Sequence, residues 1–209
     1  MDVSYPPEPW DLHGHSLVSA FLVPAREAPP VPAGLRPLRL LGRVVVAAAW
    51  VVYEEPSPLT YRELMTTVLV REGWRPRVCI THIWVDSPAS VAGGRELWAI
   101  PKDLADFSVP GSGTDGAYAM RLRAAETAAT VTRGVRRLPI RLPLRFRIAQ
   151  DGVVHGRPGL TVSPVSLSSP IGVGRARWRV DPAGPIGFLA DRRPLLTLAA
   201  LRFRMRFGS

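Results

Sequence analysis

The chain has 209 residues, of which 46% are hydrophobic and 21% charged, a balance that is typical of a globular protein and excludes a disordered one. Its net charge of +10 invites comparison with nucleic-acid-binding proteins, but no basic helix, zinc-finger spacing or aromatic RNA-binding motif accompanies the arginines. The arginines alternate with apolar residues, which indicates strands with one solvated face, or the attraction of an anionic substrate, and we predict no nucleic-acid partner.

The predicted elements are almost all strands. Four precede the middle of the chain, in residues 17–23, 40–53, 60–70 and 77–86. A short helix follows, with an Asp or Ser cap in residues 86–90, and Pro101 ends it. Six further strands are predicted in residues 117–123, 128–133, 140–148, 160–166, 174–180 and 195–207.

This succession of elements predicts a mainly β (α+β) fold. The 22 prolines are spread along the chain and argue against long helices. Ten or so strands favour a closed, cone-like antiparallel β-barrel with few short helices, because closure hides the sheet edges. We see no repeat and no second domain, so residues 1–209 are expected to form a single domain.

Two further features bear on location. The first residues have neither a basic start nor an apolar stretch, so we expect no signal peptide, and the longest apolar run, residues 44–53, is too short to span a bilayer. We therefore expect a cytoplasmic protein with no membrane partner. Cys79 is the only cysteine, which excludes an intramolecular disulfide and a cysteine-rich zinc site, and we interpret it as a small core residue.

Lys102 is the most informative residue of the chain. Lysine and arginine together number 27, and Lys102 is the only lysine among them. A guanidinium group stays protonated at physiological pH, whereas an ammonium group can be tuned to a neutral, nucleophilic amine. A lysine retained among so many arginines is therefore a candidate for imine (Schiff base) formation with a carbonyl compound. The alternative is chance retention, with the aliphatic stem on an apolar surface and the ammonium in water.

The neighbours of Lys102 favour an apolar environment. Trp98, Ile100, Leu104 and Phe107 flank it in the sequence, next to the rigid corner of Pro101. An exposed lysine has a pKa of about 10.4, and burial among apolar groups lowers that value by up to ~3–5 units. We therefore expect the pocket to hold the amine neutral.

Residues 91–102, VAGGRELWAIPK, resemble the segment around the reactive lysine of the acetoacetate decarboxylase family. The family pattern is Gly-Arg-Glu, several mostly apolar residues and then Pro-Lys, and the spacing here is ungapped. The resemblance implies a cone-like barrel around a buried Lys102. It also implies that Glu63, in Tyr61-Arg62-Glu63, is the active-site glutamate of the family's Tyr-x-Glu, where it would act as a general acid/base or orient the lysine. The alternative is a solvent-facing strand residue.

The chain also departs from the family pattern. Asp103 stands where the decarboxylases carry a second lysine, and it opposes activation of Lys102 only if it points into the pocket. The arginine of the first strand aligns near His15, with His13 as the register alternative. The family also has a further glutamate in its second strand; the corresponding position here falls in residues 44–48, which contain no acid. The resemblance thus implies a substrate-binding role for His15, and imine chemistry more firmly than acetoacetate decarboxylation.

Arg95 and Trp98 complete the expected substrate-binding set. Trp98 is expected in the pocket wall or core, and Arg95 forms a polar pair with Glu96 at the helix end. The chain contains four histidines and one cysteine, too few in any cluster to predict a metal site.

The sequence therefore predicts a cofactor-independent enzyme in which Lys102 forms an imine with a keto acid, ketone or aldehyde. Decarboxylation and aldol, dehydration or cyclisation chemistry are open alternatives, and secondary metabolism is one setting for them. A non-catalytic barrel that binds a ligand is the alternative from another class. The family resemblance also implies a homo-oligomer.

Overall fold

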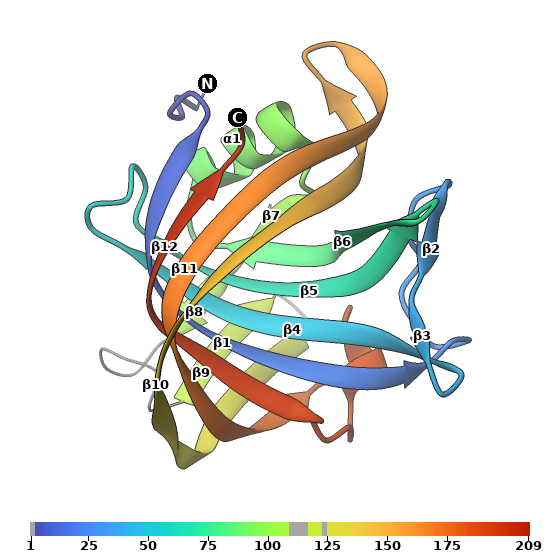
Figure 1. Ribbon diagram of the computed structural model, residues 1–209, viewed down its shortest axis with the longest axis vertical. Helices are drawn as coiled ribbons and strands as arrows, with labels where there is room; N and C mark the ends of the chain where they lie inside the picture. The colour runs from blue at the N-terminus through green and yellow to red at the C-terminus, as the bar shows by residue number, and fades with distance from the viewer. Residues whose placement is uncertain (1–2, 109–116, 123–124) are drawn as a thin grey trace.

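The computed structural model describes residues 3–108, 117–122 and 125–209. Nearly every element is a strand, as the alternating pattern predicts (Figure 1). The strands are β1 Trp10–Pro24, β2 Leu35–Pro37, β3 Arg39–Leu40, β4 Arg43–Glu54, β5 Tyr61–Glu72, β6 Arg75–Val85, β7 Lys102–Leu104, β8 Asp106–Ser108, β9 Ala117–Leu122, β10 Ala125–Val154, β11 Arg157–Val180 and β12 Leu196–Phe207. In the described residues the helices are α1, Pro88–Trp98, and a 3-10 turn, Gly187–Leu189.

The strands form one strongly curved sheet with the order β7-β6-β5-β4-β1-β12-β11-β10-β9-β8. Neighbouring strands along most of this path are antiparallel, and β6 pairs in parallel with β7. The sheet also returns on itself, because Ile148 of β10 pairs in parallel with Val78 of β6. The predicted β-rich, cone-like architecture with few helices is confirmed. In the described residues, β10 and β6 close the sheet through this single parallel bridge.

One part of the strand prediction is wrong. Residues 128–133 and 140–148 belong to the single strand β10, and residues 160–166 and 174–180 belong to β11. The prolines and glycines between these segments do not end the strands. The pairing of β10 with β11 shifts register between Val131 and Arg141, and such irregularities let a long hairpin bend around the sheet without breaking.

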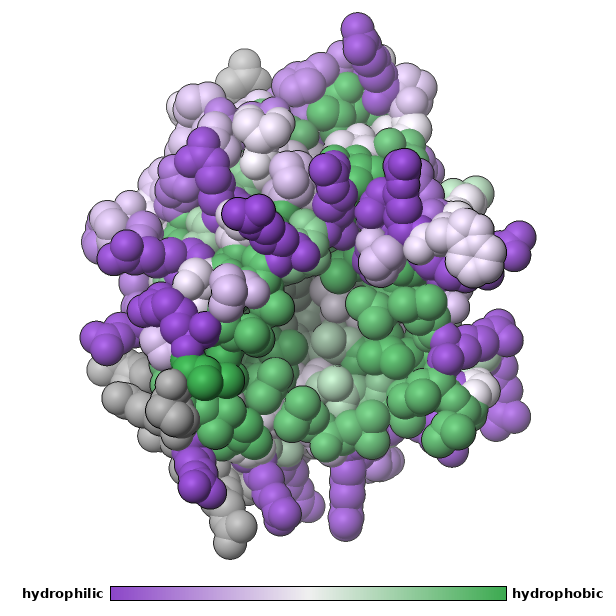
Figure 2. All heavy atoms as spheres, in the orientation of Figure 1, coloured by the Kyte–Doolittle hydropathy of each residue, from purple (hydrophilic) through white to green (hydrophobic). Residues whose placement is uncertain are grey.

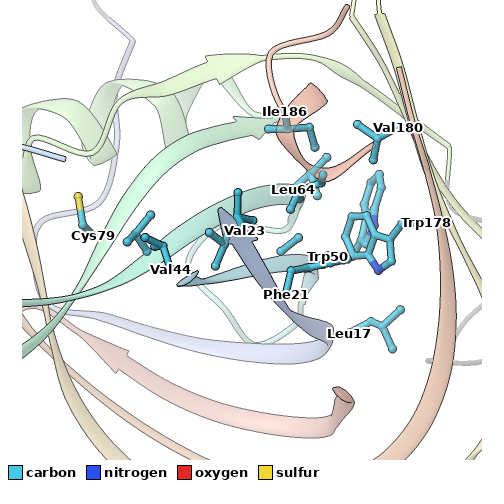
Figure 3. Packing of buried hydrophobic residues seen from close by; sticks show 14 of the residues in the cluster. Leu17, Phe21, Val23, Val44, Trp50, Leu64, Cys79, Trp178, Val180 and Ile186 are labelled. Carbon is cyan, nitrogen blue, oxygen red and sulfur yellow. The ribbon is translucent and has the colours of Figure 1, made fainter. Parts of the chain in front are cut away.

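The sheet is apolar on both faces. One face packs around Trp50, whose ring stacks on that of Trp178 with the centroids 6.1 Å apart, and Phe21 meets Trp178 edge-on at 5.9 Å (Figure 3). Cys79 lies in this cluster, which confirms it as a small core residue. The other face carries a second cluster around Trp10 and Trp98, beneath α1. Lys102 lies on this second side of the sheet.

Candidate active site

Helix α1 and the turn after it position Lys102 on the sheet. The side chain of Ser87 caps the helix by accepting a hydrogen bond from the Ser90 backbone, and Pro88 follows in the first turn. The helix ends at Trp98, because Ala99 adopts a left-handed conformation (φ 54°). The chain then turns back, and Lys102 pairs with Ile83 of β6. The predicted short helix is confirmed, although it ends at Trp98, ahead of the predicted stop at Pro101.

The amine of Lys102 is buried and has three hydrogen-bond acceptors. Lys102 is only 4% exposed. Its Nζ lies 2.8 Å from Ser90 Oγ, 3.1 Å from Glu63 Oε2 and 3.2 Å from the Tyr61 hydroxyl oxygen. Glu63 and Tyr61 lie two residues apart on β5 and therefore point to the same face of the sheet, whereas Ser90 comes from the first turn of α1. The amine thus sits where helix and sheet meet.

A second tyrosine supports the carboxylate. Tyr53 of β4 donates a hydrogen bond to Glu63 Oε1 over 3.1 Å, and its ring lies against that of Tyr61 with the centroids 4.4 Å apart. Burial and the neighbouring Glu63 raise the pKa of Tyr53 well above 10.0, and burial also raises the pKa of Tyr61. Both phenols therefore stay protonated, and Glu63 is held by Tyr53 on one oxygen and by Lys102 on the other.

The charge state of Lys102 differs from the sequence-based expectation. Burial lowers its pKa, but the adjacent Tyr61 and Glu63 favour the ammonium, and the pKa ends above its ordinary value of 10.5. Apolar surroundings alone do not hold this lysine neutral, and that expectation is wrong for the ligand-free site. The resting site is an ion pair, in which Lys102 Nζ lies 3.1 Å from Glu63 Oε2.

The pair lies at one end of a cavity of about 340 Å³. Strands β1, β4, β5, β6, β10, β11 and β12 all contribute to its wall. Its lining residues include Trp10, Leu12, Val18, Ala47, Ala49, Val51, Met65, Ile80, Trp98, Leu142, Leu144, Phe146, Leu167, Leu198 and Phe203. The view in Figure 2 shows a hollow in the molecule surrounded by hydrophobic residues. An apolar cavity with a few convergent polar groups at one end is the usual form of a small-molecule site.

Arg95 and Asp103 lie outside this cavity. Arg95 Nη2 contacts Asp103 Oδ1 at 2.5 Å, with both side chains more than half exposed. Arg95 Nε also donates to the backbone oxygen of Lys102 over 2.8 Å. Asp103 therefore points away from the amine, and the predicted substrate-binding residue Arg95 instead fastens the backbone of Lys102 to α1.

His15 is also not brought to Lys102. The residues of β1 that line the cavity are Trp10, Leu12, Ser16 and Val18, and His15 points to the opposite face. Its Nδ1 lies 3.2 Å from Glu54 Oε1, and its buried Nε2 has no hydrogen-bond partner among the residues that the structure describes. Side chains alternate along β1, whose pairing with β4 is unbroken from His13 to Pro24, so that His15 faces away from the side on which Leu12 and Ser16 line the cavity.

Trp98 lines the cavity, as expected for a pocket wall. Its Nε1 donates to Glu8 Oε2 over 2.8 Å, and its ring packs edge-on against Trp10 at 4.9 Å. Sequence reasoning missed Ser90 and Tyr53. In the sequence, Ser90 is recognisable only as part of the segment that caps a helix, and Tyr53 only as one residue of an apolar strand. Neither pattern indicates a role in a site.

Other kinds of site are not seen in the described part of the chain. No group of three or more His, Cys, Asp or Glu side chains is arranged there to hold a metal ion. None of its helices combines the length and the apolar character needed to cross a membrane.

Gly94 gives a test of how tightly Lys102 is positioned. A Cβ atom at residue 94 would lie 2.8 Å from Lys102 Cδ and 2.9 Å from Cε. We expect Gly94→Ala to fold, because alanine favours a helix by about 1 kcal/mol over glycine, yet to displace the lysine side chain from Glu63. Two quantities are measured: the rate of imine formation at Lys102, which is expected to fall at least tenfold, and the melting temperature, which is not expected to fall.

Gly93→Ala is the matched comparison. A Cβ at residue 93 would lie 2.6 Å from the Trp10 ring, which is a large buried group and not the far end of a flexible chain. This variant is expected to lower the melting temperature, in contrast to Gly94→Ala. A Gly94→Ala protein that forms the imine at the wild-type rate would show that the position of the Lys102 stem is not critical.

Comparison with known proteins agrees with this geometry. A family model described as acetoacetate decarboxylase (ADC) matches residues 4–155, and thus includes Glu63, Ser90 and Lys102. No curated protein sequence matches the chain.

Several solved structures share the fold. An acetoacetate decarboxylase from Legionella pneumophila has a TM-score of 0.72 and 15% identity, covering 99% of this chain and 87% of that one. The enduracididine biosynthesis enzyme MppR complexed with pyruvate has a TM-score of 0.64 and 18% identity, with coverages of 99% and 90%. An acetoacetate decarboxylase-like enzyme from Sphingomonas wittichii has a TM-score of 0.61 and 17% identity, covering 99% of this chain and 94% of that one. At these identities the likeness is one of fold.

Proposed function

We propose, from the premise that the chain belongs to the acetoacetate decarboxylase family, that it is a cofactor-independent enzyme in which Lys102 forms an imine with a carbonyl substrate. The observation that carries the proposal is the burial of the chain's only lysine against Glu63, at the end of an apolar cavity. Tyr61 and Ser90 fix the direction of the amine, and Tyr53 fixes the carboxylate.

Imine formation begins with a proton transfer inside the pair. The Lys102 ammonium gives one proton to Glu63, 3.1 Å away, and the freed lone pair forms a bond to the carbonyl carbon. The carbonyl oxygen takes up two protons, one from the nitrogen and one from Glu63, and leaves as water. The products are a protonated imine and a water molecule, Glu63 is again a carboxylate, and no proton has entered or left the site.

The protonated imine is an electron sink for the next step. Glu63 can remove a proton from the carbon next to the imine, and the C–H electron pair then forms the C=C bond of an enamine while the nitrogen becomes neutral. The enamine carbon can attack a second carbonyl group, which leads to aldol, dehydration or cyclisation products. In a β-keto acid the same sink accepts the electron pair of the C–CO2⁻ bond, and CO2 leaves.

Borohydride trapping tests the proposal directly. The purified protein is treated with borohydride and, in turn, a simple ketone, an aldehyde, pyruvate or acetoacetate, and its intact mass is measured. We expect a reduced adduct with at least one of these carbonyl compounds, and peptide mapping should place it on Lys102. The N-terminal amine is the internal comparison, because the chain has no other lysine. An adduct on the N-terminus alone, or none at all, would instead favour a barrel that binds a ligand without chemistry.

A further inference from the structure

The charge of the cavity wall indicates the class of substrate. Among the residues that line the cavity, the charged ones are Lys102 and Glu63, and they are paired with each other. The other lining residues are apolar, apart from hydroxyl groups such as those of Ser16 and Thr67. We propose that the substrate is a neutral ketone or aldehyde with a long apolar chain rather than a small keto acid; the carbonyl end of this assignment rests on the function proposed above.

A carboxylate would be poorly accommodated in this cavity. Once Lys102 has become an imine, its positive charge is already opposed by Glu63, and no arginine contributes to the described wall. The nearby Arg95 is directed outward to Asp103. A buried anion without a cation or hydrogen-bond donors of its own loses the solvation that water gives it, and such a group enters an apolar site only at high cost.

The shape of the cavity suits a chain. In the pairing of β4 with β5, Val51 stands opposite Glu63, Ala49 opposite Met65, and Ala47 opposite Thr67. These three levels all line the cavity, so that it follows the strands for about 14 Å from the level of the carboxylate, at ~3.4 Å per residue.

Small side chains leave this path open. Ala47 and Ala49 occupy the positions where larger residues would fill the space between β4 and the opposite wall. That wall is the apolar row Leu142, Leu144, Phe146 of β10. Leu142 is 36% and Leu144 42% exposed, so that this row reaches solvent and gives an apolar chain a continuous apolar route inward. Hydrophobic residues likewise surround the hollow in Figure 2.

The test uses two matched series of methyl ketones. In one, the chain lengthens by methylene groups from methyl ethyl ketone to methyl nonyl ketone; in the other, the far methyl group is replaced by a carboxylate. Binding is measured without reductant by tryptophan fluorescence, and imine formation is measured separately as the borohydride adduct on Lys102. We expect the dissociation constant of the neutral series to fall about fourfold per methylene until the cavity is filled. The carboxylate series should bind at least tenfold more weakly at equal length.

Because binding and adduct formation are measured separately, the substrate class and the imine mechanism can fail independently of each other. Chain-length-dependent binding without an adduct on Lys102 would support the apolar ligand and overturn the imine mechanism. Adducts that form equally well with both series, or better with the carboxylates, would support the imine mechanism and overturn the substrate class. Neither binding nor adducts in either series would overturn both.

Variants of the two alanines of β4 that line the cavity give a second, independent readout. Ala49→Leu and Ala47→Leu narrow the path at two different levels, and both are expected to shift the best-bound ketone to a shorter chain, more strongly for Ala49→Leu. Ala183→Leu makes the same change in an exposed loop and should leave the chain-length profile as in the wild type. A profile unchanged in the two cavity variants, with wild-type melting temperatures, would overturn the proposed path.

Discussion

Lys102→Arg is expected to form no borohydride-stable adduct at residue 102 with any carbonyl compound and to lose the imine-dependent exchange of the wild type. Arginine keeps a positive charge next to Glu63, but its guanidinium group does not lose a proton at any pH at which the protein is studied, and it forms no comparable imine. Two isotope readouts require no knowledge of the natural substrate. Exchange of ¹⁸O from water into a ketone reports imine formation, and exchange of deuterium into its α-carbon reports the enamine.

Lys102→Met separates loss of chemistry from loss of charge. It also forms no adduct at residue 102, but it leaves the buried Glu63 without its cation, which costs about 3–5 kcal/mol of stability. Because the folded-state pKa of Lys102 is raised, the ammonium contributes stability at all pH values below its unfolded pKa of about 10.4. The stability gap between wild type and Lys102→Met should therefore persist through neutral pH and shrink as the pH rises through the raised pKa. A ¹⁸O exchange rate in Lys102→Arg equal to that of the wild type would refute the role of this amine.

Glu63→Gln is expected to divide the reaction into its two halves. The amide cannot remove a proton from carbon, so α-deuterium exchange should fall by roughly 10²–10⁴. Imine formation is expected to be slower, because Glu63 no longer relays protons, but to survive: without the carboxylate, burial outweighs the groups that favour the ammonium more strongly, and the pKa of Lys102 falls below its wild-type value. The borohydride adduct should accordingly still appear on Lys102, while the deuterium readout disappears.

Glu72→Gln is the matched control on the same strand. Glu72 pairs with Arg77 away from the cavity, and the same chemical change there should leave both isotope readouts at wild-type rates. If Glu63→Gln kept full deuterium exchange, the base would have to be another group, and Glu63 would be a positioning residue only. If it lost the adduct as well, proton transfer from the ammonium to Glu63 would be required for the amine to react.

Lys102 and Glu63, which the structure brings together, could both be singled out from the sequence because each leaves a local signal. Lys102 is conspicuous as the only lysine, and Glu63 shares a strand face with Tyr61. Ser90 and Tyr53 could not be found in the same way. Their roles depend on which helix turn and which neighbouring strand meet the amine, and that meeting is a property of the tertiary structure.

Two errors each have a physical explanation. The first strand was predicted from residue 17, whereas β1 begins at Trp10, and alternation along that longer strand turns His15 away from the face of Trp10 and Leu12. The charge of Lys102 depends on the balance between burial and two polar neighbours, whereas the sequence displays only the apolar neighbours. The curved sheet itself was predictable, because alternation of arginines with core residues, as at Phe203 and Arg204, recurs in strand after strand.

The burial of Lys102 has a consequence for the exterior of the protein. Positive charge outside the cavity is carried entirely by guanidinium groups and the chain's own amino terminus, because no second lysine exists. Ketones and simple aldehydes condense readily with primary amines but not with guanidinium. A ketone or aldehyde in solution therefore finds a side-chain amine in one place only, inside the cavity, and the side chains of the outer surface offer it no amine to modify.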